Sequence, residues 1–402
     1  IAPGLKNPGT IASAVRMTRI ILPAQLFFFV GGLLMAVQFS KERFFIPALA
    51  PLLYNLGIIS GGILLGPWIG MEGFAWGVLI GAFGGNLLVQ FFGVRKTGLQ
   101  YRFIFDLGHP DLRKYVFLTL PLMVGLTMTF STEFFFRLFG SYLPEGSIAV
   151  LNFGLRIMLI LVGLFGQAVG TASFPFLARL AAENKINDMN RLLNHTLRFL
   201  ALVIPFSVLL MVLRSEVVRI IFERGKFDAA ATALTAEVLM YLLVGAFAFA
   251  AYTIVVRGYF ASQNTLFPAL YGTIVVVLSI PLYLLGMNLL GVRGVALAVS
   301  LSGIFQVTVL YALWNKRSNN TESRQVYVFY FRMMCFAAVL GIFLAWFKSA
   351  ALFWIDSATF QGSLMVSLLT GAVFLGILLT VGYGRKIKEV TELVSRLVKK
   401  LR

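Results

Sequence analysis

The chain has 402 residues, of which 59% are apolar and only 12% are charged. A soluble globular protein is about half apolar and about a quarter charged, so these fractions exclude an ordinary soluble domain and also a disordered chain. The net charge of +18 comes from 34 lysines and arginines, but no basic stripe is interleaved with exposed aromatic residues, so we expect no nucleic-acid partner. The composition predicts a polytopic membrane protein.

Apolar runs long enough to cross a bilayer occur about eleven times, which predicts an all-α fold with about 11 transmembrane helices. The predicted spans are 19–39, 47–68, 73–93, 115–138, 149–173, 196–213, 230–256, 267–287, 294–314, 328–347 and 362–383. Prolines 23, 121 and 281 fall inside them, which helices bundled in a membrane tolerate.

Basic residues are distributed unequally between the two sets of alternating loops. One set, which includes the segment 96–114 and the tail 385–402, holds more than twice as many lysines and arginines as the other. The positive-inside rule makes this set cytoplasmic, so the C-terminus is predicted to be cytoplasmic. The tail 385–402 alternates apolar and basic residues in a way that predicts an amphipathic helix on anionic lipid.

Two stretches match at a constant offset of 221 residues (268 − 47 and 291 − 70), which pairs Pro47 with Pro268 and Gly70 with Gly291. Because the offset contains six predicted spans, the repeat is parallel, as in transporters whose site lies between two related bundles. The later bundle has three spans ahead of its matching part, so we expect three further helices before Ile1. The prediction is two pseudo-symmetric six-helix bundles followed by two extra helices.

These patterns divide the chain into five predicted regions. They are the remainder of an N-terminal bundle (1–95), a cytoplasmic linker (96–114), a C-terminal six-helix bundle (115–316), two extra transmembrane helices (326–384) and the cytoplasmic amphipathic tail (385–402).

Three stretches resemble one known family. Residues 43–55 resemble RF-x-x-PA-x-AP-x-x-x-N, residues 170–177 resemble G-T-x-x-x-P-x-L, and residues 222–227 resemble F-x-x-G-x-F of the MurJ/MviN lipid II flippases. This resemblance implies a member of the multidrug/oligosaccharidyl-lipid/polysaccharide exporter superfamily. Such a protein moves lipid II, the undecaprenyl-pyrophosphate-linked peptidoglycan precursor, to the periplasmic leaflet of the bacterial inner membrane by alternating access.

The resemblance also implies the partners and the alternatives. We expect a monomer that contacts lipid II and membrane lipids and needs no cofactor or metal, with the region 326–384 forming a groove for the lipid tail. An enzyme is disfavoured because His109 and His195 are far apart in the sequence and no cluster of acids accompanies them. A drug or cation antiporter of the same superfamily and an O-antigen-type lipid-oligosaccharide flippase remain open alternatives.

Ionisable residues at membrane depth are rare and mark function by default. Arg156 lies well inside the span 149–173, and an arginine stays charged and can bind phosphate with two parallel hydrogen bonds. The family carries a cavity arginine at the matching position, which implies substrate binding by Arg156, with Asn152 one turn before it. The alternative is an arginine that extends to the interface. Among the interfacial arginines, Arg19 is the one most expected to reach the cavity, whereas Arg257 is expected to be an interfacial anchor.

Glu133 and Arg137 are four residues apart, a spacing that places them on one helical face as an ion pair. A structural bridge and a gate or coupling pair are both compatible with this spacing.

Overall fold

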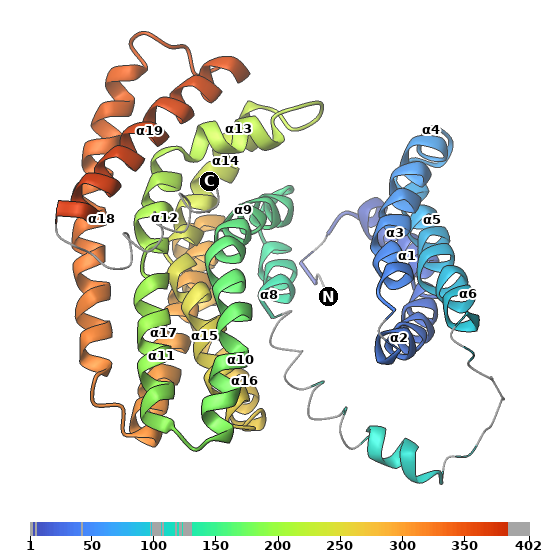
Figure 1. The fold of residues 1–402 in the computed structure, drawn as a ribbon. Helices are drawn as coiled ribbons and strands as arrows, with labels where there is room; N and C mark the ends of the chain where they lie inside the picture. Colours follow the sequence, from blue (N-terminus) through green and yellow to red (C-terminus); the bar gives the residue numbers. More distant parts are fainter. Residues whose placement is uncertain are drawn as a thin grey trace. The chain divides into compact units, whose positions relative to one another are not determined.

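The computed structural model describes residues 3–4, 6–41, 43–96, 98, 106, 108–116, 119, 123 and 131–384. In this part of the chain, every regular element is a helix (Figure 1). Nine candidate spans within it are long and apolar enough to cross a membrane, or ten if the bent pair α14–α15 is counted as one span. The prediction of an all-α, multi-pass membrane fold is confirmed. Half of the predicted span 115–138, about half of the linker 96–114 and the whole tail 385–402 lie outside the described residues.

The chain divides into two compact units, each described here by itself. The N-terminal unit covers Leu5–Arg113, and the C-terminal unit covers Lys114–Arg402 together with Ile1–Gly4.

The N-terminal unit is a bundle of helices. Its described elements are α1 (Pro8–Ile21), α2 (Ala24–Ser40), α3 (Phe45–Leu64), α4 (Gly66–Ile69), α5 (Glu72–Gly81), the π-helical turn η1 (Ala82–Leu88) and α6 (Val89–Arg95). Helix α1 begins well before residue 19, where the first span was predicted to start. The Asn7 side chain accepts hydrogen bonds from the amides of Gly9 and Thr10 and so caps this helix. Hydropathy does not detect the part of α1 before residue 19, because this part of the helix carries polar and basic residues.

Small residues and buried amides hold this unit together. A Cβ atom added to Gly57 would lie 2.5 Å from the Cα of Gly81, so α3 and α5 pack with their backbones in contact. The buried Gln90 side chain accepts a hydrogen bond of 2.9 Å from Gln38 and donates one of 3.2 Å to the carbonyl of Ile46. These bonds connect α6 to α2 and to the start of α3, where an unpaired amide would be costly.

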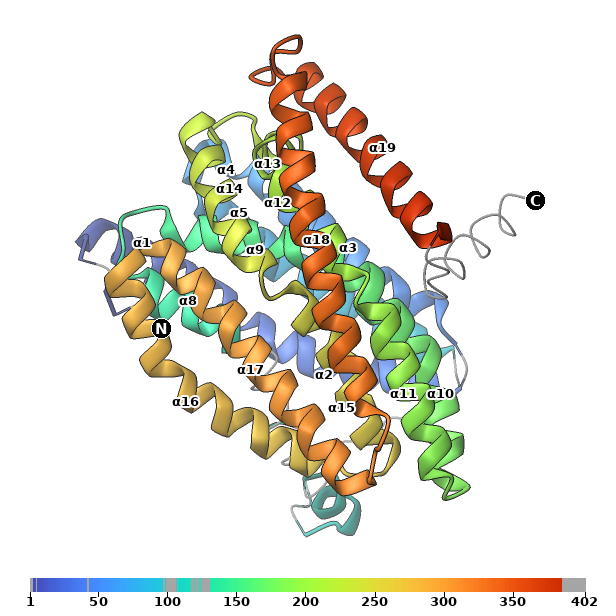
Figure 2. The same ribbon diagram turned by 90° about the vertical axis from the view of Figure 1, so that its left-hand side faces the viewer.

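The C-terminal unit holds the remaining helices. They are α8 (Ser131–Gly140), α9 (Ser147–Val162), the π-helical turn η2 (Gly163–Gln167), α10 (Ala168–Ala182), α11 (Ile186–Leu200), α12 (Val203–Val212), α13 (Arg214–Phe222), α14 (Ala229–Leu243), α15 (Ala246–Ala261), α16 (Leu266–Leu290), α17 (Val292–Ser318), α18 (Ser323–Ala351) and α19 (Phe360–Gly384). Helices α16 and α17 run side by side as a hairpin, and α18 and α19 form a second one (Figure 2).

The glycine turn predicted by the repeat has the same backbone in both halves. Gly70, between α4 and α5, has φ 61° and ψ −136°, and Gly291, between α16 and α17, has φ 58° and ψ −132°. A positive φ is accessible to glycine at little cost. Two glycines 221 residues apart therefore turn the chain in the same way, as the repeat predicts.

A buried polar network joins α11 to α17. Trp314 donates a hydrogen bond of 2.9 Å to the Asn190 side chain, and the Tyr311 hydroxyl donates one of 2.6 Å to Asn194. The side chain of Asn320, just after α17, exchanges hydrogen bonds of 2.9 Å with Asn194. The network fixes the register of α11, whose other face is strongly polar.

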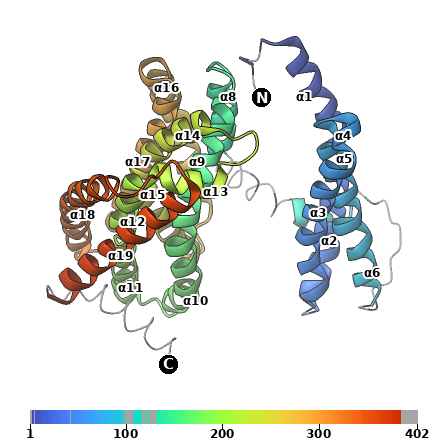
Figure 3. The same cartoon turned by 90° about the horizontal axis from the view of Figure 1, so that it is seen from above.

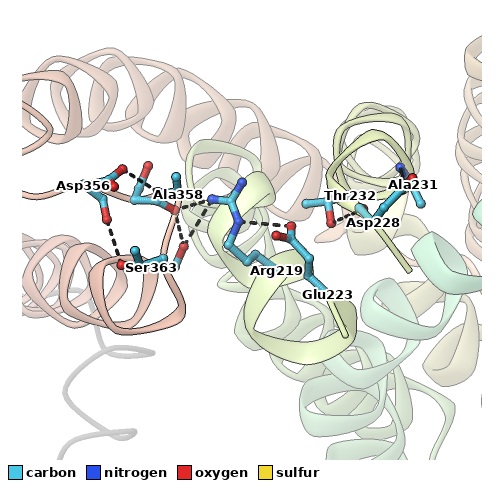
Figure 4. Close-up of polar contacts among 10 residues, drawn as sticks. Arg219, Glu223, Asp228, Ala231, Thr232, Asp356, Ala358 and Ser363 are labelled. Carbon is cyan, nitrogen blue, oxygen red and sulfur yellow. Dashed lines mark hydrogen bonds and ion pairs between the residues drawn. The ribbon is translucent and has the colours of Figure 1, made fainter. Parts of the chain in front are cut away.

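One ion pair and two hydrogen bonds attach the α18–α19 hairpin to α13, and we call these contacts, together with the Arg219–Glu223 pair, the α13 junction. Figure 4 shows the part of the junction around Arg219. The Nζ atom of Lys348 lies 2.7 Å from Oε2 of the buried Glu216. On the next turn, Arg219 Nε donates to Glu223 Oε2 at 3.1 Å. The other end of the Arg219 guanidinium donates to the carbonyl of Ser357 and to the Ser363 hydroxyl, at the start of α19.

Candidate functional site

Arg156 lies midway along α9, on the face that the rest of the C-terminal unit leaves uncovered. The opposite face packs against α14, where a Cβ atom added to Gly154 would lie 3.1 Å from a Leu242 methyl carbon. The Arg156 side chain is exposed, and it makes no hydrogen bond or ion pair with the described part of the chain. Its charge is therefore not neutralised by the protein around it.

Asn152 lies one turn before Arg156 and is half-buried. Its side-chain amide donates a hydrogen bond of 2.8 Å to the carbonyl of Ile148, within the same helix. This bond fixes the side chain and leaves its amide oxygen as an acceptor beside Arg156. Such an acceptor suits a hydroxyl or N–H group rather than an anion.

The segment 222–227 packs onto α9 at this level. The rings of Phe222 and Phe227 lie 4.8 and 5.2 Å from the Phe153 ring, measured between centroids. Gly225 has φ 62°, which allows the chain to turn so that both aromatic rings reach the same partner. The aromatic cluster thus holds the part of α9 that carries Asn152 and Arg156.

Arg257 on α15 is the functional candidate that sequence reasoning missed. Its Nη2 atom donates to Gln167 Oε1 at 3.2 Å and to Thr171 Oγ1 at 3.3 Å. Its Nη1 atom is buried and has no hydrogen-bond partner in the described part of the chain. The structure thus places this guanidinium against α10, and its role as an interfacial anchor stays a prediction. The available signal was the pair of polar residues at 167 and 171, four apart in an apolar run.

Gly170 makes room for this arginine. A Cβ atom added to Gly170 would lie only 1.6 Å from Nη1 of Arg257, so a larger residue would displace the guanidinium. This gives a physical role to the glycine of the stretch 170–177.

We define the polar stripe as Asn152, Arg156, Gln167, Thr171 and Arg257. Four of these residues lie along the continuous run α9–η2–α10, and the fifth reaches it from α15 (Figure 1). Exposed apolar side chains surround them, among them Leu159, Ile160 and Leu164. Within the described residues, neither of its two arginines is paired with a carboxylate. The stripe therefore presents positive charge in apolar surroundings, which favours an anionic group.

The other predicted site residues lie elsewhere. Glu133 and Arg137 are both exposed on α8, with 3.9 Å between Oε2 and Nη2, and a gating role for the pair stays a prediction. Arg19 is exposed on α1, in the N-terminal unit, and its role in the cavity also stays a prediction. Its neighbour Arg16 binds Glu72 of α5 at 2.8 Å. Within the described ranges, no three His, Cys, Asp or Glu side chains gather as metal ligands would.

A comparison with protein families matches residues 1–364 to the family described as "Lipid II flippase MurJ". The chain belongs to the MurJ family. The proteins of this family are named as flippases rather than as enzymes. This confirms the family resemblance carried by the stretches 43–55, 170–177 and 222–227.

Curated MurJ proteins are similar along most of this chain. The "Probable lipid II flippase MurJ" of Rhizobium tropici is 28% identical over 326 residues, which cover 79% of this chain and 61% of that protein. The Vibrio cholerae protein of the same name is 26% identical over 392 residues, which cover 96% of this chain and 74% of the Vibrio cholerae protein. This chain spans about three fifths of the length of the Rhizobium tropici and Rhizobium meliloti relatives.

A solved MurJ structure has the same fold. The lipid II flippase MurJ in an inward closed conformation matches with a TM-score of 0.72 and 25% identity, over 94% of this chain and 76% of that one. Together with the apolar helices, this MurJ fold makes the protein a multi-pass membrane protein.

Proposed function

We propose that the protein moves lipid II from the cytoplasmic to the periplasmic leaflet of a bacterial inner membrane by alternating access. Membership of the MurJ family supports this proposal. The observation on which it rests is Arg156, an exposed arginine midway along α9, in the first third of a membrane-length helix run, with no counter-ion among the described residues.

The chemistry of the stripe fits such a substrate. Lipid II carries an anionic pyrophosphate between a polar head and an apolar tail. Arg156 binds the pyrophosphate through the parallel N–H donors of its planar guanidinium, and Arg257 adds a second positive charge where it reaches the same run of helices from α15. Asn152 supplies a hydrogen-bond acceptor for the sugar-peptide head, and a substrate-binding role for Arg19 is a separate part of the proposal.

The remaining features follow from the same proposal. The two helices of the region 326–384, seen as α18 and α19, offer exposed apolar side chains that suit a lipid tail, among them Phe331, Val339 and Ile342. The protein works as a monomer, with its C-terminus in the cytoplasm.

Rescue of a strain depleted of its own lipid II flippase tests the proposal. The full-length protein is expected to restore growth, and Arg156→Ala is expected to lower rescue by about a hundredfold, since one charge-assisted phosphate contact is worth about 3 kcal/mol. Arg156→Lys keeps the positive charge but loses the planar guanidinium with its parallel N–H donors, so this variant is expected to rescue in part.

Arg293→Ala is the matched control. Arg293 is an exposed arginine that lies 2.6 Å from Glu237, and its loss is expected to leave rescue unchanged. Full rescue by Arg156→Ala at equal membrane abundance would disprove the phosphate role. Failure of the unaltered protein to rescue would instead show that lipid II is not its substrate.

A further inference from the structure

A second basic site lies between α11 and α18, away from the residues that carry the proposed function. A cavity of about 490 Å³ opens there, and its lining includes three arginines from two helices: Arg198, Arg324 and Arg332. Thr321 and Gln325 add neutral polar groups. None of the described residues that line the cavity is acidic.

Two of these arginines have no partner of their own among the described residues. Arg324 and Arg332 are both exposed, and neither makes an ion pair or hydrogen bond with the described part of the chain. They are eight residues apart on α18, which corresponds to a rise of about 12 Å. Glu322 is the acid nearest to them in sequence, but its carboxylate lies 3.8 Å from Arg191 and lines a neighbouring pocket.

Two of the residues that line the cavity, Val328 and Phe329, are apolar. The guanidinium carbon of Arg198 lies 5.1 Å from the centre of the Phe329 ring, a cation–π contact that fixes the arginine against α18. Val328 forms another part of the wall, and Phe331 beside it is exposed. Since α18 is a candidate membrane span, the arginines stand at one end of an apolar surface suited to acyl chains.

We propose that Arg198, Arg324 and Arg332 bind the phosphodiester headgroup of an anionic membrane phospholipid in this cavity. Arginine pairs with phosphate oxygens through parallel hydrogen bonds, and basic pockets between membrane helices bind anionic headgroups in this way. Free phosphate has the same chemistry, but only a lipid uses both the arginines and the apolar surface that adjoins them.

Lipid retention tests the proposal. The full-length protein is reconstituted in vesicles of phosphatidylcholine mixed with phosphatidylglycerol and extracted in mild detergent, and retained lipids are quantified by mass spectrometry. The double variant Arg324→Gln/Arg332→Gln is expected to retain about thirtyfold less phosphatidylglycerol relative to phosphatidylcholine, because each arginine near a membrane surface contributes about 1 kcal/mol.

Two controls make this result specific. Arg179→Gln/Arg293→Gln removes the same charge from exposed ion pairs elsewhere and is expected to retain lipid like the unaltered protein. An equal loss of phosphatidylglycerol from both double variants would overturn the proposal, because the net charge of the protein, and not this cavity, would then explain lipid retention. Arg156→Ala is expected to retain phosphatidylglycerol normally, which separates this cavity from the proposed substrate site.

A measurement on the unaltered protein distinguishes the lipid from free phosphate and does not depend on folding of the variants. Micelles that contain phosphatidylglycerol are expected to raise the melting temperature, whereas inorganic phosphate is not. Equal stabilisation by phosphate alone, or none by phosphatidylglycerol, would overturn the assignment to a lipid.

Discussion

The α13 junction and the polar stripe, both of which contain residues of the C-terminal unit, differ in whether their charged side chains have partners of opposite charge. At the α13 junction, each of the buried or half-buried charged groups meets an opposite charge, as Lys348 does with Glu216 and Arg219 with Glu223. On the polar stripe, Arg156 has no partner and Arg257 has only neutral ones within the described residues. Both regions contain arginine, so residue type alone does not separate them.

The difference indicates what each region does. A pair of charges that satisfy one another stabilises one arrangement of helices and leaves no free charge for a ligand. An arginine without a counter-ion is costly in apolar surroundings unless a ligand supplies the anion. We therefore assign the α13 junction to the attachment of the α18–α19 hairpin, which lies at the edge of the unit (Figure 3), and the stripe to binding.

Lys348→Met should have the largest effect on stability among changes at the junction. It leaves Glu216, which is only 2% exposed, without its ion pair, so we expect the free energy of unfolding to fall by about 3–5 kcal/mol. Thermal unfolding of the purified protein measures this loss. A second change, Glu216→Met, should restore most of the stability, because two apolar side chains pack without an unpaired charge.

Lys185→Met is the matched control for this change. Lys185 lies 2.7 Å from Glu183, but both side chains are largely exposed, so we expect a loss below about 1 kcal/mol. If Lys348→Met cost no more than this control, the junction would not be the attachment point inferred for the hairpin.

Arg219→Gln should have an intermediate effect. It removes one ion pair and the hydrogen bonds to Ser357 and Ser363, and we expect a loss of about 2 kcal/mol. Limited proteolysis should then cut the 352–359 connection between α18 and α19 faster. Arg224→Gln is the control, because Arg224 is exposed in the connection between α13 and α14. This variant should change neither the free energy of unfolding nor the rate of proteolysis. Equal proteolysis of the two variants would contradict the assignment of the α13 junction to attachment of the hairpin.

Glu133→Gln should have the smallest effect on stability. The pair with Arg137 is half exposed, with 3.9 Å between the charged atoms, so we expect a change below about 0.5 kcal/mol. The same variant separates the two interpretations of this pair. A loss of rescue at unchanged stability would support a gate or coupling role, whereas unchanged rescue would leave only a weak surface bridge.

The membrane fold was predictable from the sequence because long apolar runs have few other uses. The repeat was predictable as well, since Gly70 and Gly291 stand at positions where only a residue that tolerates positive φ fits easily. The start of α1 was not predictable from hydropathy, because Asn7 and Pro8 define it through capping, while Arg16 and Arg19 lower its apolar content.

The candidate site was only partly predictable. Arg156 stands out as an isolated charge in an apolar span, which a linear sequence can show. Arg257 does not, because its partners Gln167 and Thr171 are 90 and 86 residues away and meet it only through the packing of α10 on α15. The same is true of Lys348 and Glu216, which are 132 residues apart.

The π-helical turns have a consequence for helical phase. A π-turn fits an extra residue into a helix, so the helix beyond it is rotated by about 100° relative to an uninterrupted α-helix. The turn η2 lies between Arg156 and Thr171, and η1 lies just before Gln90. Deleting one residue from η2 would rotate Gln167 and Thr171 away from Arg257, and the same deletion in η1 would rotate Gln90 away from Gln38. In both units, a single inserted residue sets the angle at which the polar groups beyond it face their partners.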